Sequence, residues 1–148
     1  DSGQYQPLTL AKAVTRASWM KKQFDDAQSQ TVRRGLQAGP ELERSLLAGP
    51  WHPAFGELVA SRMMLQQTRK VLANAEKADR NNKAYQSKDK PVYLTINQRD
   101  QSMFRGMRSA NIRRLEQLGL WQQVVLTTNS TQPRHTVCIT SPPNKELI

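Results

Sequence analysis

The sequence has few of the residues that build metal clusters or covalent cross-links. It contains one cysteine, Cys138, and two histidines, His52 and His135, which lie far apart in the chain. One cysteine cannot form an internal disulfide, a zinc cluster or a CxxxCxxC iron–sulfur site. Cys138 lies in the strand-like run Thr-Val-Cys-Ile-Thr, and we expect it to be a buried strand cysteine. We expect no metal site built from this chain alone.

Long apolar runs are also lacking. No run approaches the roughly 18 residues of a membrane-spanning helix. The first four residues, Asp-Ser-Gly-Gln, carry neither a basic nor an apolar leader. We therefore expect a cytoplasmic protein with no membrane contact. This beginning also suggests that the chain does not start where its gene starts.

Acidic side chains are scarce relative to basic ones. The 148 residues hold 22 Lys and Arg against 12 Asp and Glu, a net charge of +10. Residues 1–58 hold seven basic and six acidic side chains, a net of +1, whereas residues 59–148 hold fifteen and six, a net of +9. Such asymmetry indicates a polyanionic partner, most often nucleic acid. The alternative is a solvated surface that happens to be basic.

The first half of the sequence predicts helices and one short strand. Apolar residues spaced by three and four predict a helix from Leu10 to about Asp25, with Thr9 as its N-cap. Thr31–Gln37 is typical of a short strand, and a single helix–strand step cannot bury its own faces. The remaining elements are a helical turn over Glu41–Leu47, a proline-bounded turn over Ala48–Pro53 and a long helix from Pro53 to about Ala75.

The second half predicts a small mixed layer. Residues 76–90 are polar and form the expected linker. Residues 91–140 then read as β-α-α-β-β, and residues 141–148 as a loose tail. The expected strands are Pro91–Asn97, Trp121–Thr127 and His135–Thr140, and the two helices are Arg99–Arg105 and one capped by Ser109, with Ile112, Leu115 and Leu118 on its buried side.

A glycine-bearing turn between those two short helices is a candidate nucleic-acid-binding motif. It resembles the GxxG loop of the KH domain, which grips a nucleic-acid backbone between two helices. The helix after the turn would present free N–H groups and a positive dipole end to phosphate. Ser109 stands where the second glycine of that loop belongs. The alternative is a helix–helix corner with solvated arginines. The candidate nucleic-acid-binding residues are Arg105, Gly106, Arg108, Ser109, Arg113 and Arg114.

Two further positions are candidate ligand contacts. His52, in the proline-bounded turn, could be an N-cap, a substrate contact or a general base, and no partner acid is fixed by the sequence. Gly35, Leu36 and Gln37 lie at the C-terminal end of the expected first strand, where α/β folds place ligands.

Several stretches in this order resemble the C-terminal third of bacterial radical SAM proteins. These are Fe–S oxidoreductases similar to the Elongator catalytic subunit or to oxygen-independent coproporphyrinogen III oxidase. The most specific stretch is Gly-Pro-Trp-His-Pro-Ala-Phe-Gly-Glu-Leu-Val at residues 49–59, and the others include residues 5–14 and Arg34-Gly35-Leu36-Gln37.

The resemblance implies a partial (β/α) barrel that binds a [4Fe-4S] cluster and S-adenosylmethionine. It implies an α+β chain in which residues 1–37 are the last helix and strand of the barrel and residues 53–75 a connecting helix. Residues 1–75 would thus be the C-terminal end of the barrel together with the connecting helix, and residues 91–140 would form a C-terminal module. Gly35, Leu36, Gln37 and His52 would lie near the cofactor. The cluster cysteines belong to the N-terminal part of such a barrel, which would be a partner of this chain. Neither group would be bound by this chain alone, and we expect it to be inactive alone.

Three functional readings follow from the sequence. In the first, the chain ends a radical SAM enzyme and its basic module presents an RNA substrate, such as tRNA, to the barrel. In the second, it is a stand-alone, non-enzymatic nucleic-acid-binding module. In the third, it is a structural or interaction domain with no nucleic-acid role.

Overall fold

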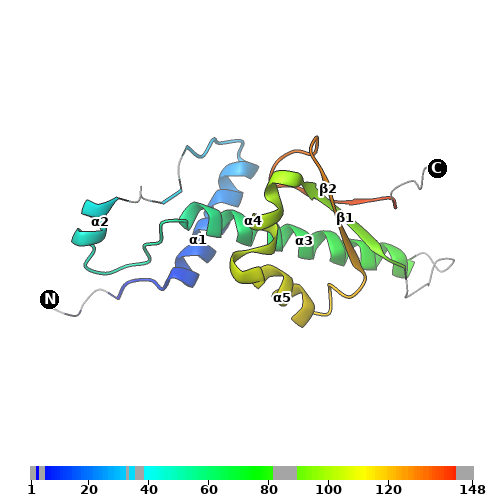
Figure 1. The fold of residues 1–148 in the computed structure, drawn as a ribbon, viewed down its shortest axis with the longest axis horizontal. Helices are drawn as coiled ribbons and strands as arrows, with labels where there is room; N and C mark the ends of the chain where they lie inside the picture. Colours follow the sequence, from blue (N-terminus) through cyan, green and yellow to red (C-terminus); the bar gives the residue numbers. More distant parts are fainter. Residues whose placement is uncertain (1–2, 4–5, 33, 36–38, 82–89, 143–148) are drawn as a thin grey trace. The chain divides into compact units, whose positions relative to one another are not determined.

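The computed structural model describes residues 3, 6–32, 34–35, 39–81 and 90–142. These residues form a mixed α and β structure with five α-helices and one three-stranded sheet (Figure 1). The chain divides into two compact units, Asp1–Arg62 and Met63–Ile148. None of the described helices is both long enough and apolar enough to cross a membrane.

The first unit begins with α1 (Leu10–Asp26), as the apolar spacing predicts. Thr9 is its N-cap, and the Thr9 hydroxyl accepts a hydrogen bond from the Lys12 N–H at 3.3 Å. The expected strand over Thr31–Gln37 is wrong for the residues that are described: Thr31, Val32, Arg34 and Gly35 have no strand structure. Val32 is 94% exposed, because the segment has no described strand beside it and few apolar residues to bury. Leu36 and Gln37 lie outside the described residues.

Two more helices follow, α2 (Pro40–Ser45) and α3 (Phe55–Asn81). The third helix continues six residues beyond the expected end at Ala75, into the segment predicted to be a linker. The sequence Ala-Glu-Lys-Ala that follows Asn74 consists of strong helix formers, so nothing local stops the helix there. Residues 82–89 of the expected linker, and residues 143–148 of the expected tail, lie outside the described residues.

The second unit combines the later part of α3 with a small sheet. Its elements in order are β1 (Val92–Asn97), the 3₁₀ turn η2 (Gln98–Asp100), α4 (Gln101–Arg105), the 3₁₀ turn η3 (Met107–Ser109), α5 (Ala110–Gln117), β2 (Val124–Asn129) and β3 (Val137–Thr140). The strand order is β2-β1-β3. β1 pairs in parallel with β2, with Leu94 opposite Leu126, and antiparallel with β3, with Leu94 opposite Ile139.

One apolar cluster holds this unit together. Its buried members are Met64, Leu72, Leu94, Ile96, Phe104 and Val137. Leu94 and Ile96 alternate along β1 and are fully buried, so the helices cover one face of the sheet. β2 starts three residues later than the sequence suggests, and Trp121 instead packs beside Phe104 with ring centroids 6.0 Å apart.

The prediction for Cys138 is confirmed for its secondary structure and wrong for its burial. Cys138 does lie in a strand, β3, but the structure leaves it exposed. Its neighbour Val137 is buried, and alternate residues of a strand point to opposite faces. Cys138 therefore belongs to the face that the helices do not cover.

Candidate nucleic-acid interface

The turn between α4 and α5 has an unusual backbone. Gly106 ends α4 with φ 73° and ψ 168°. Arg108 (φ 50°, ψ 36°) and Ser109 (φ 59°, ψ 30°) then adopt the left-handed conformation one after the other. Left-handed backbone costs an L-residue about 1–2 kcal/mol. Ser109 thus takes, at a cost, the conformation that a glycine would take freely.

The hydrogen bonds of the turn change one sequence expectation. The Ser109 N–H donates to the Gly106 carbonyl at 2.9 Å, and the Ala110 N–H donates to the Met107 carbonyl. These two N–H groups at the start of α5 are therefore occupied and cannot also bind phosphate. Ser109 is the N-cap residue as predicted, but its side chain makes no capping hydrogen bond. The binding capacity of the turn depends on side chains rather than on free N–H groups.

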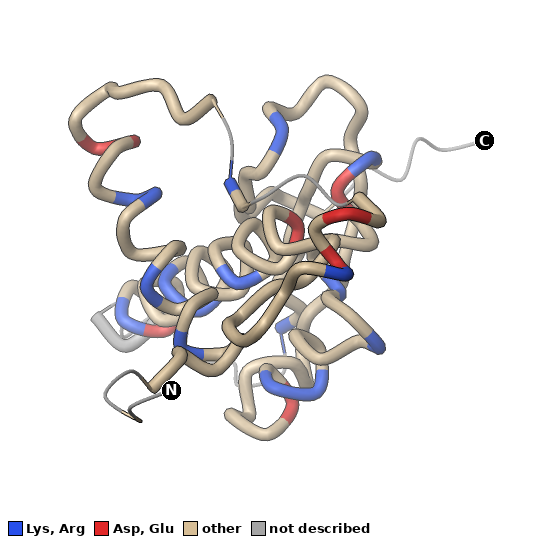
Figure 2. The backbone as a smooth tube through the Cα atoms, turned by 90° about the vertical axis from the view of Figure 1, so that its left-hand side faces the viewer, with Lys and Arg blue, Asp and Glu red and all other residues tan. Residues whose placement is uncertain are grey.

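Those side chains are arginines. Arg105, Arg108, Arg113 and Arg114 are all exposed. None of them forms an ion pair with a carboxylate within the part of the chain that the structure describes. Arg114 donates a weak hydrogen bond, 3.3 Å long, to the Gln117 side chain. Figure 2 shows that basic positions are spread over several elements, so the turn is distinguished by its backbone as well as by its charge.

Asn111 stabilises the turn through a hydrogen bond to α4, a role that the sequence analysis did not predict. Its side chain is buried and its Nδ2 donates to the Phe104 carbonyl at 2.9 Å. This bond ties the first turn of α5 to the last turn of α4, on either side of Gly106. Phe104 is itself only 1% exposed, so the turn is anchored in the apolar cluster of the second unit.

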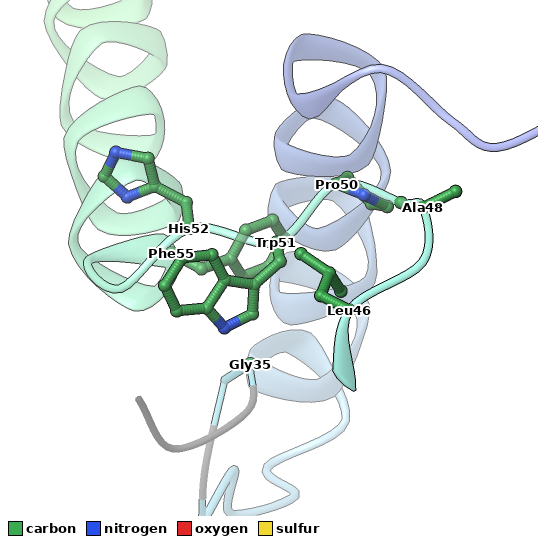
Figure 3. A pocket seen from close by; sticks show the side chains of 8 residues that line it. Gly35, Leu46, Ala48, Pro50, Trp51, His52 and Phe55 are labelled. Carbon is green, nitrogen blue, oxygen red and sulfur yellow. The ribbon is translucent and has the colours of Figure 1, made fainter. Parts of the chain in front are cut away.

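A second candidate site lies in the first unit. An apolar cavity of about 260 Å³ is lined by Gly35, Leu46, Ala48, Gly49, Pro50, Trp51, His52 and Phe55. The structure thus brings Gly35 and His52 to one cavity. Figure 3 shows the indole nitrogen of Trp51 on the side of the ring that faces Gly35, while the His52 imidazole points away from Leu46. The Trp51 Nε1 is buried and has no hydrogen-bond partner in the described part of the chain.

His52 has a local structural role. Its Nδ1 accepts a hydrogen bond from the Ala54 N–H at 3.0 Å, and its carbonyl accepts one from the Phe55 N–H at 3.0 Å. Of the three roles that the sequence left open, this geometry supports the capping role at the start of α3. Gly35 has φ 87°, and a Cβ on it would lie 3.2 Å from Phe55, so a glycine is needed where this segment contacts α3.

The described residues do not by themselves fit the groups that the sequence resemblance implies. They contain no group of three or more His, Cys, Asp or Glu side chains able to hold a metal ion. No charged side chain of the described residues lines the cavity beside His52, whereas S-adenosylmethionine carries a carboxylate, an ammonium and a sulfonium. Any such site would need residues beyond the described ones.

Comparisons with known proteins identify no relative of this chain. A scan of protein-family models and searches of curated proteins and solved structures gave no match.

Proposed function

We propose that this chain binds RNA through its second unit, with the turn between α4 and α5 contacting the phosphate backbone. The observation that carries the proposal is the pair of consecutive left-handed residues, Arg108 and Ser109, in a turn flanked by exposed arginines. Strained backbone of this kind is concentrated at binding sites, where the surrounding structure holds it. Exposed arginines without a carboxylate partner are available to phosphate oxygens.

Salt-dependent RNA binding tests this proposal. The full chain is titrated into a fluorescent 20-nucleotide single-stranded RNA between 50 and 200 mM salt. Each arginine–phosphate contact adds about 0.7 to the slope of log affinity against log salt on a single strand. The double variant Arg108→Gln with Arg113→Gln should lower the affinity and reduce the slope by roughly 1.4.

The matched control removes the same charge from α1. Lys12 and Arg16 are exposed on that helix, and Lys12→Gln with Arg16→Gln should leave both affinity and slope almost unchanged. If the two double variants behave alike, binding is a general effect of the net charge and the turn is not the site. The chain would then be a structural or interaction domain.

We also propose that the first unit packs against further polypeptide, as the resemblance to radical SAM proteins implies. Trp19, Met20 and Phe24 on α1 are 62%, 49% and 46% exposed, and Leu47 is 99% exposed. The three buried polar atoms without a partner among the described residues, Thr31 Oγ1, Trp51 Nε1 and Arg62 Nε, all belong to this unit. Uncovered apolar side chains together with unsatisfied buried polar atoms indicate an incomplete fold.

The size of the protein in its source cells tests this second proposal. An antibody raised against the chain should detect a species well above 16.8 kDa. Anaerobic reconstitution of that species should then yield a [4Fe-4S] spectrum. A species of the same mass as the chain would contradict the enzyme reading and leave a stand-alone nucleic-acid-binding module.

A further inference from the structure

The face of the sheet that the helices leave uncovered carries a polar hollow of about 470 Å³. Its floor is formed by one threonine from each strand, Thr95 of β1, Thr127 of β2 and Thr140 of β3. Gln98 and Asn129, which stand at the C-terminal ends of β1 and β2, contribute to its rim. Among the residues that the structure describes, no charged side chain lines it.

The three threonine hydroxyls form a chain whose direction can be worked out. Thr127 Oγ1 donates its proton to the Leu94 carbonyl at 3.1 Å. When all of these hydrogen bonds form together, the 2.6 Å contact between Thr95 Oγ1 and Thr127 Oγ1 has Thr95 as donor, because each hydroxyl has one proton and that of Thr127 goes to Leu94. The 2.8 Å contact between Thr140 Oγ1 and Thr95 Oγ1 must then have Thr140 as donor. All three protons are used within the sheet.

The floor of the hollow consequently offers only hydrogen-bond acceptors. Thr140, which is exposed, keeps two lone pairs free, and the half-buried Thr127 keeps one. A phosphate would meet lone pairs, and an ammonium group would meet no carboxylate of the described residues to neutralise it. The complementary group is a neutral hydrogen-bond donor, and in RNA the sugar 2′-hydroxyl is such a donor on every nucleotide, which DNA lacks.

The hollow is within reach of the turn. Gln98 and Gly106 are separated by η2 and α4, which together span about 13 Å at roughly 2 Å per residue in a 3₁₀ turn and 1.5 Å in an α-helix. A few nucleotides of a single strand held by the arginines can cover this distance. We propose that the hollow binds a ribose 2′-hydroxyl of the bound RNA, with Thr140 as the accepting group that discriminates RNA from DNA. This inference rests on the proposed RNA binding.

Three probes of one sequence test the inference on the full chain: an RNA, the corresponding DNA and the 2′-O-methyl RNA. The methylated strand keeps the RNA shape and the 2′ oxygen but has no proton to donate. The unmodified chain should bind RNA about fivefold more tightly than either of the others, the effect of one net hydrogen bond.

Thr140→Val should make the three affinities equal, since valine has the shape of threonine without its lone pairs. It leaves no buried donor unsatisfied, because Thr95 still donates to Thr127. Thr140→Ser, which keeps the hydroxyl, should preserve the discrimination. Thr15→Val on α1, where the exposed threonine donates to the Ala11 carbonyl at 2.8 Å, is the matched control and should change nothing.

Two outcomes would overturn the inference. The first is equal binding of RNA and 2′-O-methyl RNA by the unmodified chain, since the 2′ proton would then not be recognised. The second is unchanged discrimination in Thr140→Val. Failure of the proposed RNA binding itself looks different: the Arg108 and Arg113 double variant would then bind every probe as the unmodified chain does.

Discussion

Asp100 shows how much one buried side chain can organise. Its carboxylate is fully buried at the start of α4 and accepts a hydrogen bond from Arg134 Nε at 2.6 Å. It accepts a second, also of 2.6 Å, from the N–H of His135, whose φ is 61°. Asp100 therefore connects the loop between β2 and β3 to the segment that follows β1.

Replacing Asp100 by asparagine should destabilise the second unit. The substitution removes the charge that pairs with Arg134, and hydrogen bonds to charged groups contribute about 1.5–3 kcal/mol. We expect a loss of about 2 kcal/mol in the free energy of unfolding, measured by urea denaturation. Asp26→Asn is the control, because Asp26 pairs with Lys22 on an exposed helix face, where such pairs contribute about 0.2–0.5 kcal/mol. Equal losses in the two variants would contradict the role given to Asp100.

In the first unit, Gly35 occupies a position where a glycine is needed. Gly35→Ala would force a side chain into a positive φ and against Phe55, at a cost of about 1–3 kcal/mol. The unfolding midpoint followed by tryptophan fluorescence should fall. Gly39→Ala should have little effect, since Gly39 has φ −165° and open space around its Cα. If Gly39→Ala lowered the unfolding midpoint more than Gly35→Ala does, the contact between Gly35 and Phe55 would contribute little to stability.

At the level of elements, the turn between α4 and α5 is held in a costly conformation by its surroundings. Asn111 and Phe104 connect the two helix ends, and Arg108 and Ser109 between them adopt the left-handed conformation. If this turn binds RNA as proposed, it does not lose that conformational entropy on binding, because it is already ordered.

Ser109→Gly should therefore stabilise the second unit. Glycine adopts φ 59° without strain, and the Ser109 side chain makes no capping bond that would be lost. We expect a gain of about 0.5–1 kcal/mol, less than the full relief because glycine loses more entropy on folding. Ser102→Gly, at an exposed position in α4, should lower the stability by about 0.5–1 kcal/mol. A loss of stability in Ser109→Gly would mean that the turn is not strained.

For the whole molecule, the two units differ in how completely they are packed. Among the described residues, the buried apolar residues of the first unit are Ala13, Val14, Val59 and Ala60, all small or medium in size. The second unit buries leucine, isoleucine, methionine and phenylalanine in one cluster. The first unit should open more readily, because little apolar surface is re-exposed when it does.

Amide hydrogen exchange of the full chain measures this difference. Amides of α1 should exchange at least about tenfold faster than those of residues 64–72 of α3, although both segments are helical. Binding of further polypeptide to the first unit should slow exchange in α1 selectively. Equal protection of the two segments in the isolated chain would contradict the incompleteness of the first unit.

Local signals in the sequence predicted those features whose causes are local. Thr9 caps α1 because its hydroxyl reaches the third residue after it. The end of α5 has a local cause of the same kind, which the structure shows: Gly119 has φ 69°, its N–H donates to the Glu116 carbonyl, and the Leu120 N–H donates to the Leu115 carbonyl. The expected strand over Thr31–Gln37 is not formed at residues 31–32 and 34–35. A strand needs a neighbouring strand, and the composition of one segment does not show whether such a neighbour is present.

Local patterns along the chain predicted the places of the helices, although not the end of α3, and also the turn at Gly106 and the excess of positive charge in residues 59–148. Only the tertiary structure placed Thr95 against Thr127 and Thr140, which are 32 and 45 residues away in the chain, and Asp100 against Arg134, 34 residues away. These residues come together because the register of strand pairing is set by the burial of Leu94 and Ile96 on one face of the sheet. The hydroxyls on the opposite face are aligned as a consequence, and no spacing along the chain encodes that alignment.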